Sequence, residues 1–158
     1  MTRRELREHV FRILFACDFL KTQRQDQPYQ WPDEDAVKEQ IDLYFTHEGG
    51  DDLEFPPCEV SDEDRETVRE RALSVSVKVQ EIDRLLDETS TGWKTSRMAR
   101  ADLCILRLAV YEMIYDDQIP TGVAINEAVL LAKKFGGDDS SSFVNGILAK
   151  LERQNSDR

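Results

Sequence analysis

The apolar residues of this chain recur mostly at intervals of three and four, the spacing that places side chains on one face of an α-helix. No segment of useful length alternates apolar and polar residues as a half-buried β-strand does. The predicted helices cover residues 3–21, a segment from about Asp33, a segment after Ser61, residues 98–115, residues 122–135 and a segment from Asp139 or Ser140. The pattern therefore predicts an all-α fold with about six or seven helices.

Two of these segments have distinctive apolar patterns. After Ser61, a near-heptad seam is formed by Val68, Ala72, Val75, Val79, Ile82 and Leu86. A seam of this kind needs a partner, so we expect one continuous helix that packs against the first helix of the chain. Residues 98–115 are apolar nearly all round, which predicts a central buried helix.

The ends of the predicted helices also carry local signals. Thr2 and Glu5 have the spacing of a capping box, in which the two side chains satisfy free amides at a helix start. Gly136 and Gly137 follow the helix predicted over residues 122–135. We expect a glycine there to end the helix in the left-handed conformation.

The net charge of −11 is concentrated in one segment. Residues 26–64 contain 14 of the 32 acidic side chains and one basic side chain, Lys38, a net charge of −13. The rest of the chain has 20 basic and 18 acidic side chains, a net charge of +2. Because binding depends on the local field, the overall acidity does not exclude a nucleic-acid partner. Residues 47–60, rich in Gly, Asp and Pro, are expected to form a mobile acidic loop.

Several classes of protein are disfavoured by composition. Apolar runs are too short for a membrane span, and the first residues lack a signal-peptide pattern, so a cytoplasmic protein without membrane partners is expected. Three widely spaced cysteines favour reduced thiols, and two histidines make a zinc site unexpected. No phosphate loop, nucleophile elbow or metalloprotease motif occurs, so we expect no cofactor and no enzymatic activity.

The C-terminal half contains three specific motifs. Residues 120–128 read PTGVAINEA, residues 132–136 read AKKFG, and residues 140–146 read SSSFVNG. The first helix adds an arginine-rich start followed by Arg7 and Glu8. In this combination the chain resembles the NusB family of bacterial transcription antitermination factors. The resemblance covers residues 1–22 and 88–152 well, whereas residues 23–64 are longer and more acidic than the family pattern.

The resemblance implies a fold and a set of partners. It implies two small helical bundles sharing an interface, one over residues 1–88 with the acidic insert at about 23–64, the other over residues 89–158. It also implies binding of boxA, a single-stranded RNA element, together with NusE, a small ribosomal-subunit protein. The expected activity is assembly on RNA polymerase to suppress termination, especially in ribosomal RNA transcription.

Single-stranded RNA is held by cations along its backbone and by aromatic faces under unstacked bases. By position in the family motifs, the resemblance implies RNA contacts for Arg3, Arg4, Arg7, Trp93, Arg97, Phe135, Asp139 and Phe143. Trp93 and Arg97 would face the same strand if their segment is helical. The same analogy points to Phe15 and Asp102 as contacts for the partner protein.

Each of these assignments has a structural alternative. Phe135 and Phe143 adjoin apolar helices and could be core residues, while Trp93 could staple a helix junction. Asn126 and Asn145 are expected to be buried hydrogen-bonding groups that fix helix packing. The alternative function is a helical adaptor that binds NusE or a polymerase-associated protein without reading RNA.

Overall fold

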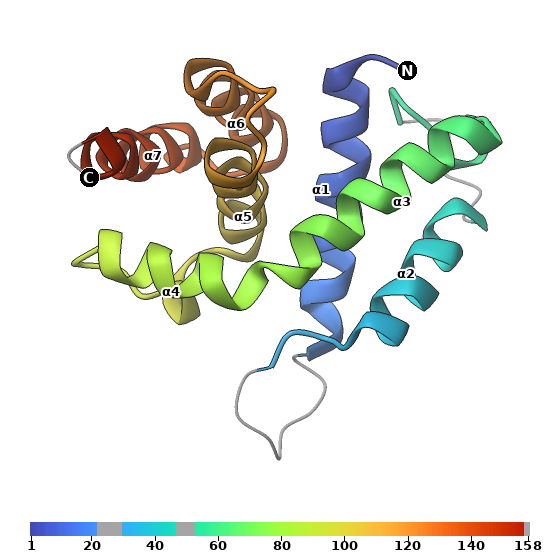
Figure 1. Ribbon diagram of the computed structural model, residues 1–158, viewed down its shortest axis with the longest axis horizontal. Coiled ribbons are helices and arrows are strands. Elements are labelled where there is room, and N and C mark those ends of the chain that lie inside the picture. Colours follow the sequence, from blue (N-terminus) through green and yellow to red (C-terminus); the bar gives the residue numbers. More distant parts are fainter. Residues whose placement is uncertain (22–29, 47–52, 157–158) are drawn as a thin grey trace. The chain divides into compact units, whose positions relative to one another are not determined.

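The computed structural model describes residues 1–21, 30–46 and 53–156. Its helices are α1 (Arg3–Lys21), α2 (Glu34–Thr46), α3 (Asp62–Val77), α4 (Val79–Thr89), α5 (Arg100–Tyr115), α6 (Thr121–Phe135) and α7 (Ser140–Ser156) (Figure 1). Two short 3-10 helices, η1 (Pro57–Glu59) and η2 (Thr95–Arg97), complete the regular structure, and the described residues contain no strand. The predicted all-α fold is confirmed. The chain divides into two compact units, Met1–Val77 (unit 1) and Lys78–Arg158 (unit 2).

Unit 1 packs α1 against both α2 and α3, as Figure 1 shows. Side-chain caps start all three helices: the amides of Glu5, Ala36 and Asp64 donate to Thr2 Oγ1, Asp33 Oδ1 and Ser61 Oγ at 3.1, 2.8 and 3.2 Å. Each bond satisfies an amide that has no partner inside its helix. The capping role predicted for Thr2 is therefore confirmed.

The helix predicted across the seam from Val68 to Leu86 is two helices, so the expectation of one continuous helix is wrong. The chain leaves helical geometry at Lys78, where φ is −99° and ψ is 0°. The first half of the seam, in α3, packs against α1 as expected, but the second half, in α4, packs against α5 and α7. An uninterrupted apolar spacing cannot reveal such a break, because both halves keep the same helical period. The division between units therefore falls at Val77 and Lys78, before the predicted boundary at residue 88.

Unit 2 is built around α5, which contacts α4, α6 and α7. Ten of its 16 residues are buried, which confirms the prediction of a central helix. One of them is Arg107, whose side chain is fully enclosed. Its Nε and Nη2 atoms donate to Asp83 of α4 at 2.9 and 2.8 Å. A two-pronged ion pair of this kind fixes α4 against α5, because it satisfies a charge that has no access to water.

The turn after α6 differs from the prediction. Gly136 caps the helix with φ −94° and ψ −176°, and no described glycine has a positive φ, so the left-handed cap was wrongly predicted. The glycine is required by close packing instead. A Cβ on Gly136 would overlap Ser140 and the carbonyl oxygen of Ala132.

Other predictions fall partly outside the described residues. Residues 22–29 and 47–52, which belong to the predicted connector and acidic loop, are among those not described, whereas residues 57–59 form η1. None of Cys17, Cys58 and Cys104 forms a disulfide. Within the described part of the chain, no helix is long and apolar enough to cross a membrane. The same residues hold no cluster of His, Cys, Asp and Glu suited to a metal ion.

Candidate nucleic-acid interface

Unit 2 presents an exposed aromatic and basic segment at residues 93–97. Two buried side chains, Thr95 and Met98, hold the segment onto the unit. Asp87 of α4 fixes it further, because its carboxylate accepts from the Thr95 amide at 2.7 Å and from the Thr95 hydroxyl at 3.3 Å. The neighbours of these anchors in the sequence are exposed, and they include Trp93, Lys94 and Arg97.

Trp93 forms the aromatic part of this surface. It is 57% exposed, and its ring lies 6.4 Å from that of Phe143 at an interplanar angle of 83°, an edge-to-face contact. Such a pair favours a fixed orientation of both rings. Phe143 is only partly buried, so neither ring is sealed inside the core. Trp93 precedes η2 and is not part of an α-helix with Arg97, so the one-turn geometry considered from the sequence does not apply.

The loop between α6 and α7 carries the other predicted residues of unit 2. Asp139 is exposed one residue before α7, and Phe143 follows within the first turns of that helix. Ser140 stabilises the loop, since its buried hydroxyl accepts from the Gly137 amide at 2.9 Å. Phe135, at the end of α6, is partly buried beneath the Lys134 ammonium, which lies 5.6 Å from the ring centroid. That distance is compatible with a cation–π contact.

Unit 1 carries the predicted arginines, but they do not form one exposed group. Arg3 and Arg4 are exposed in the first turn of α1, whereas Arg7 is only 7% exposed. Arg7 therefore belongs to the packed side of α1, and we expect the exposed pair alone to meet an anion. Sequence spacing assigned all three to one cluster because Arg7 lies only about one helical turn after Arg3 and Arg4, and spacing does not distinguish the packed side of a helix from the rim beside it.

The two predicted partner-binding residues differ in exposure. Phe15 is 38% exposed, and the next aromatic residue along the same face of α1, Phe19, is 61% exposed. Asp102, in the first turn of α5, is only 7% exposed, and its Oδ1 atom is buried without a hydrogen-bond partner among the described residues. An exposed aromatic pair is typical of a protein contact, whereas a buried carboxylate is not available at the surface in this conformation.

Sequence reasoning missed several polar residues of unit 2. Asn126 and Asn145 are exposed, so the expectation that they are buried packing groups is wrong. They line an open groove between α6 and α7 together with Lys133. Lys94, a further exposed cation beside Trp93, was also overlooked. Its position between an aromatic residue and Arg97 was the available signal.

Comparisons with known proteins agree with this architecture. The NusB family model matches residues 4–153. The transcription antitermination protein NusB of Agathobacter rectalis is 45% identical over 151 residues, covering 96% of this chain and 99% of that protein. NusB from T. maritima superposes with a TM-score of 0.69 at 29% identity, covering 97% of this chain and 92% of that one. A structure of the antitermination factors NusB and NusE in complex with dsRNA gives a TM-score of 0.68 at 20% identity, with 96% of each chain covered.

Proposed function

This chain belongs to the NusB family, and from that premise we propose that it is a transcription antitermination factor that binds boxA-type single-stranded RNA together with NusE. In this role it joins the RNA polymerase antitermination complex and supports ribosomal RNA transcription. The proposed activity consists of binding alone, with no catalytic step.

The observation that carries the proposal is the exposed segment at residues 93–97 beside Phe143. Trp93 offers a large exposed ring held at a fixed angle by Phe143, and Lys94 and Arg97 place cations within four residues of it. Stacking supplies roughly 1 to 3 kcal/mol per base, and cations bind the phosphates on either side. Asp139 would accept a hydrogen bond from a base edge or a ribose hydroxyl. We also propose that Phe135 contacts a base and that Arg3 and Arg4 of unit 1 contact phosphates.

A second surface fits the protein partner. Phe15 and Phe19 are spaced four residues apart on α1, so they lie on one face of the helix. We assign this face to NusE, in keeping with a structural neighbour that contains NusB and NusE. Asp102 would take part only if its surroundings open on binding, because its carboxylate is buried.

The test compares aromatic residues of the two units. We expect Phe143→Ala and Trp93→Ala each to weaken binding of a fluorescent boxA RNA about tenfold, as the loss of one stacked base requires. Phe19→Ala is the matched control, because it removes an exposed ring from unit 1. It should leave RNA affinity unchanged and weaken NusE binding. Unchanged helical circular dichroism and cooperative melting would show that each variant folds.

The same assay separates RNA binding from the adaptor alternative. If Phe143→Ala and Trp93→Ala bind RNA as well as the unmodified chain does, the RNA role is wrong. NusE binding that is lost in Phe19→Ala would then favour an adaptor. A linear fall of log affinity with log salt, at about −0.7 per phosphate, is expected for the single strand. A competing duplex should bind more weakly, since its paired bases cannot lie on Trp93.

A further inference from the structure

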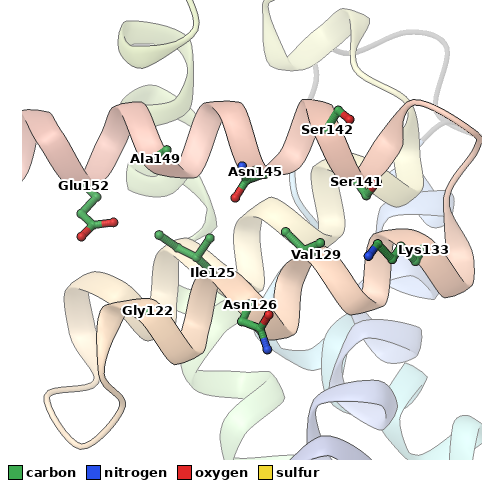
Figure 2. Close-up of a pocket in the computed structure, with 10 residues that line it drawn as sticks. All are labelled: Gly122, Ile125, Asn126, Val129, Lys133, Ser141, Ser142, Asn145, Ala149 and Glu152. Carbon is green, nitrogen blue, oxygen red and sulfur yellow. The ribbon is translucent and has the colours of Figure 1, made fainter.

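A groove of about 590 Å³ runs between α6 and α7 in unit 2. Figure 2 shows Ile125 and Val129 on the side of α6 that faces α7, with Asn145 pointing from α7 toward α6. Asn126 lies at the outer edge of α6. The volume is within the range of sites that hold one small organic group, which includes a nucleobase.

The lining combines an apolar floor with neutral hydrogen-bonding groups. The side chains of Ile125 and Val129 offer a surface on which the face of a base can lie. The carboxamides of Asn126 and Asn145 each present a donor beside an acceptor, and both residues are exposed. This pairing matches the edges of nucleobases, which present donors and acceptors side by side.

The two ends of the groove carry side chains of opposite charge. Lys133 and Ser141 lie at the end near the loop between α6 and α7, while Glu152 lies at the opposite end (Figure 2). A phosphate is favoured beside Lys133 and disfavoured beside Glu152. One nucleotide therefore fits with its phosphate toward the loop and its base toward the carboxamides.

The start of α7 connects the groove with the proposed RNA surface. Ser141 and Ser142, which line it, directly precede Phe143 in the first turns of α7. Because a helix turns about 100° per residue, Asn145 and Phe143 point to nearly opposite sides of α7. A strand that leaves the rings of Trp93 and Phe143 reaches the groove by crossing the start of α7, where Asp139 and Ser142 are exposed.

We propose that the α6–α7 groove binds one further nucleotide of the RNA strand, with Asn126 and Asn145 reading the base and Lys133 holding the phosphate. The inference rests on the proposed RNA-binding function and extends it by a site that lies beyond the aromatic pair. A protein partner would instead be expected to require more apolar surface than two side chains at the floor of the groove.

The test uses the full chain and two boxA-type RNAs, one ending at the nucleotides on Trp93 and Phe143 and one extended beyond them at both ends. Removing both carboxamides, with Asn126→Ala and Asn145→Ala combined, should weaken binding of the extended RNA about tenfold. The salt slope should not change, because no phosphate contact is lost. Lys133→Ala should lower the magnitude of the slope by about 0.7. The short RNA should bind all of these variants equally.

The matched control is Asn155→Ala, which removes an exposed carboxamide from the end of α7 that does not line the groove. It should bind both RNAs as the unmodified chain does. If the groove variants bind the extended RNA normally while Phe143→Ala does not, the groove inference is overturned and the proposed function stands. If Phe143→Ala also binds normally, both fail. Groove variants that lose NusE but retain the extended RNA would assign the groove to protein and overturn the inference.

Discussion

The two units solve the same problem, a polar group inside a helical core, with different chemistry. In unit 1 the His9 ring is fully buried, and its Nδ1 atom is hydrogen-bonded to the Tyr44 hydroxyl of α2 at 2.6 Å. Arg12 donates one hydrogen bond to the same hydroxyl at 3.3 Å and another to the Glu8 carboxylate at 2.9 Å. In unit 2 the buried group is the Arg107 guanidinium, paired with Asp83. Both arrangements tie one helix to another.

The difference lies in what acid does to each core. Burial, followed by the nearby Arg12 guanidinium, lowers the pKa of His9 from 6.5 to about 4, so the ring is neutral in the folded chain. Burial also raises the pKa of Tyr44 to about 12, which keeps its hydroxyl neutral. Arg107 keeps its charge at every ordinary pH. The stability of unit 1 therefore depends on His9, which acid can charge. The stability of unit 2 depends on Arg107, which is always charged and needs the Asp83 carboxylate beside it.

The largest effect is expected from breaking the ion pair of unit 2. Asp83→Ala removes two charge-assisted hydrogen bonds from the enclosed Arg107 guanidinium, and we expect the free energy of unfolding to fall by about 3 to 5 kcal/mol. Urea unfolding followed by circular dichroism measures the change. A loss below about 1 kcal/mol would mean that the pair does not hold α4 against α5.

The control is an exposed ion pair in unit 1. Arg69 and Asp42 lie 3.0 Å apart with side chains that are 31% and 71% exposed. Water screens such a pair, so Arg69→Ala should cost less than about 1 kcal/mol. The contrast between the two substitutions measures the effect of enclosure, because both remove one partner of an ion pair of similar length.

The next effect concerns acid and unit 1. Between pH 6.5 and 4 the unfolded chain protonates His9 while the folded chain does not, so stability present above pH 6.5 is lost as the pH falls toward 4. The loss from this group reaches about 3 kcal/mol. In His9→Gln this part of the pH dependence should disappear. An equal slope in His9→Gln, measured by urea unfolding at each pH, would show that His9 is not its source.

Each unit contains one of the two tryptophans, which allows the acid response to be located. Trp31 of unit 1 donates its Nε1–H to Ser76 at 2.6 Å, while Trp93 of unit 2 is largely exposed. Trp93→Phe leaves Trp31 as the only reporter, and Trp31→Phe leaves Trp93. We expect the Trp31 signal to respond to acid between pH 6.5 and 4 and the Trp93 signal to respond less. Identical responses would remove the distinction between the units.

Most of the fold was predictable because its signals are local. Thr2 and Ser61 mark helix starts through their own side chains, and the apolar spacing gave α1 and α5. The break at Lys78 was not predictable, because the apolar period continues through it and only the packing partners change. The geometry of Gly136 was not predictable either. Glycine is favoured both in a left-handed turn and where another group approaches closely, and the sequence does not distinguish these two cases.

The candidate site residues were predicted from the family resemblance, because residue type alone would place aromatic side chains such as Trp93 and Phe15 in the core. Trp93, Asp139 and Phe15 are exposed, as any surface contact requires, and their binding roles stay predictions. Asn126 and Asn145 were misjudged because a polar residue in an apolar helix is compatible with either a buried bond or a groove edge. Helical phase separates these cases only when the packing of the neighbouring helices is known.

The smallest effect on stability is expected from a change in the loop of unit 2 that bears Asp139. In Gly136→Ala the added methyl group meets Ser140 and the Ala132 carbonyl, and we expect a loss of about 2 kcal/mol from this overpacking. RNA affinity should fall as well, since Ser140 must shift and it holds the loop before α7. Gly137→Ala is the control, because a Cβ there would have no atom within 4 Å.

Equal thermal stability and RNA affinity in the two variants would show that close packing at Gly136 does not determine the conformation of the loop. A selective loss in Gly136→Ala would show that the proposed RNA surface of unit 2 depends on tight contacts, unlike the hydrogen-bonded core of unit 1.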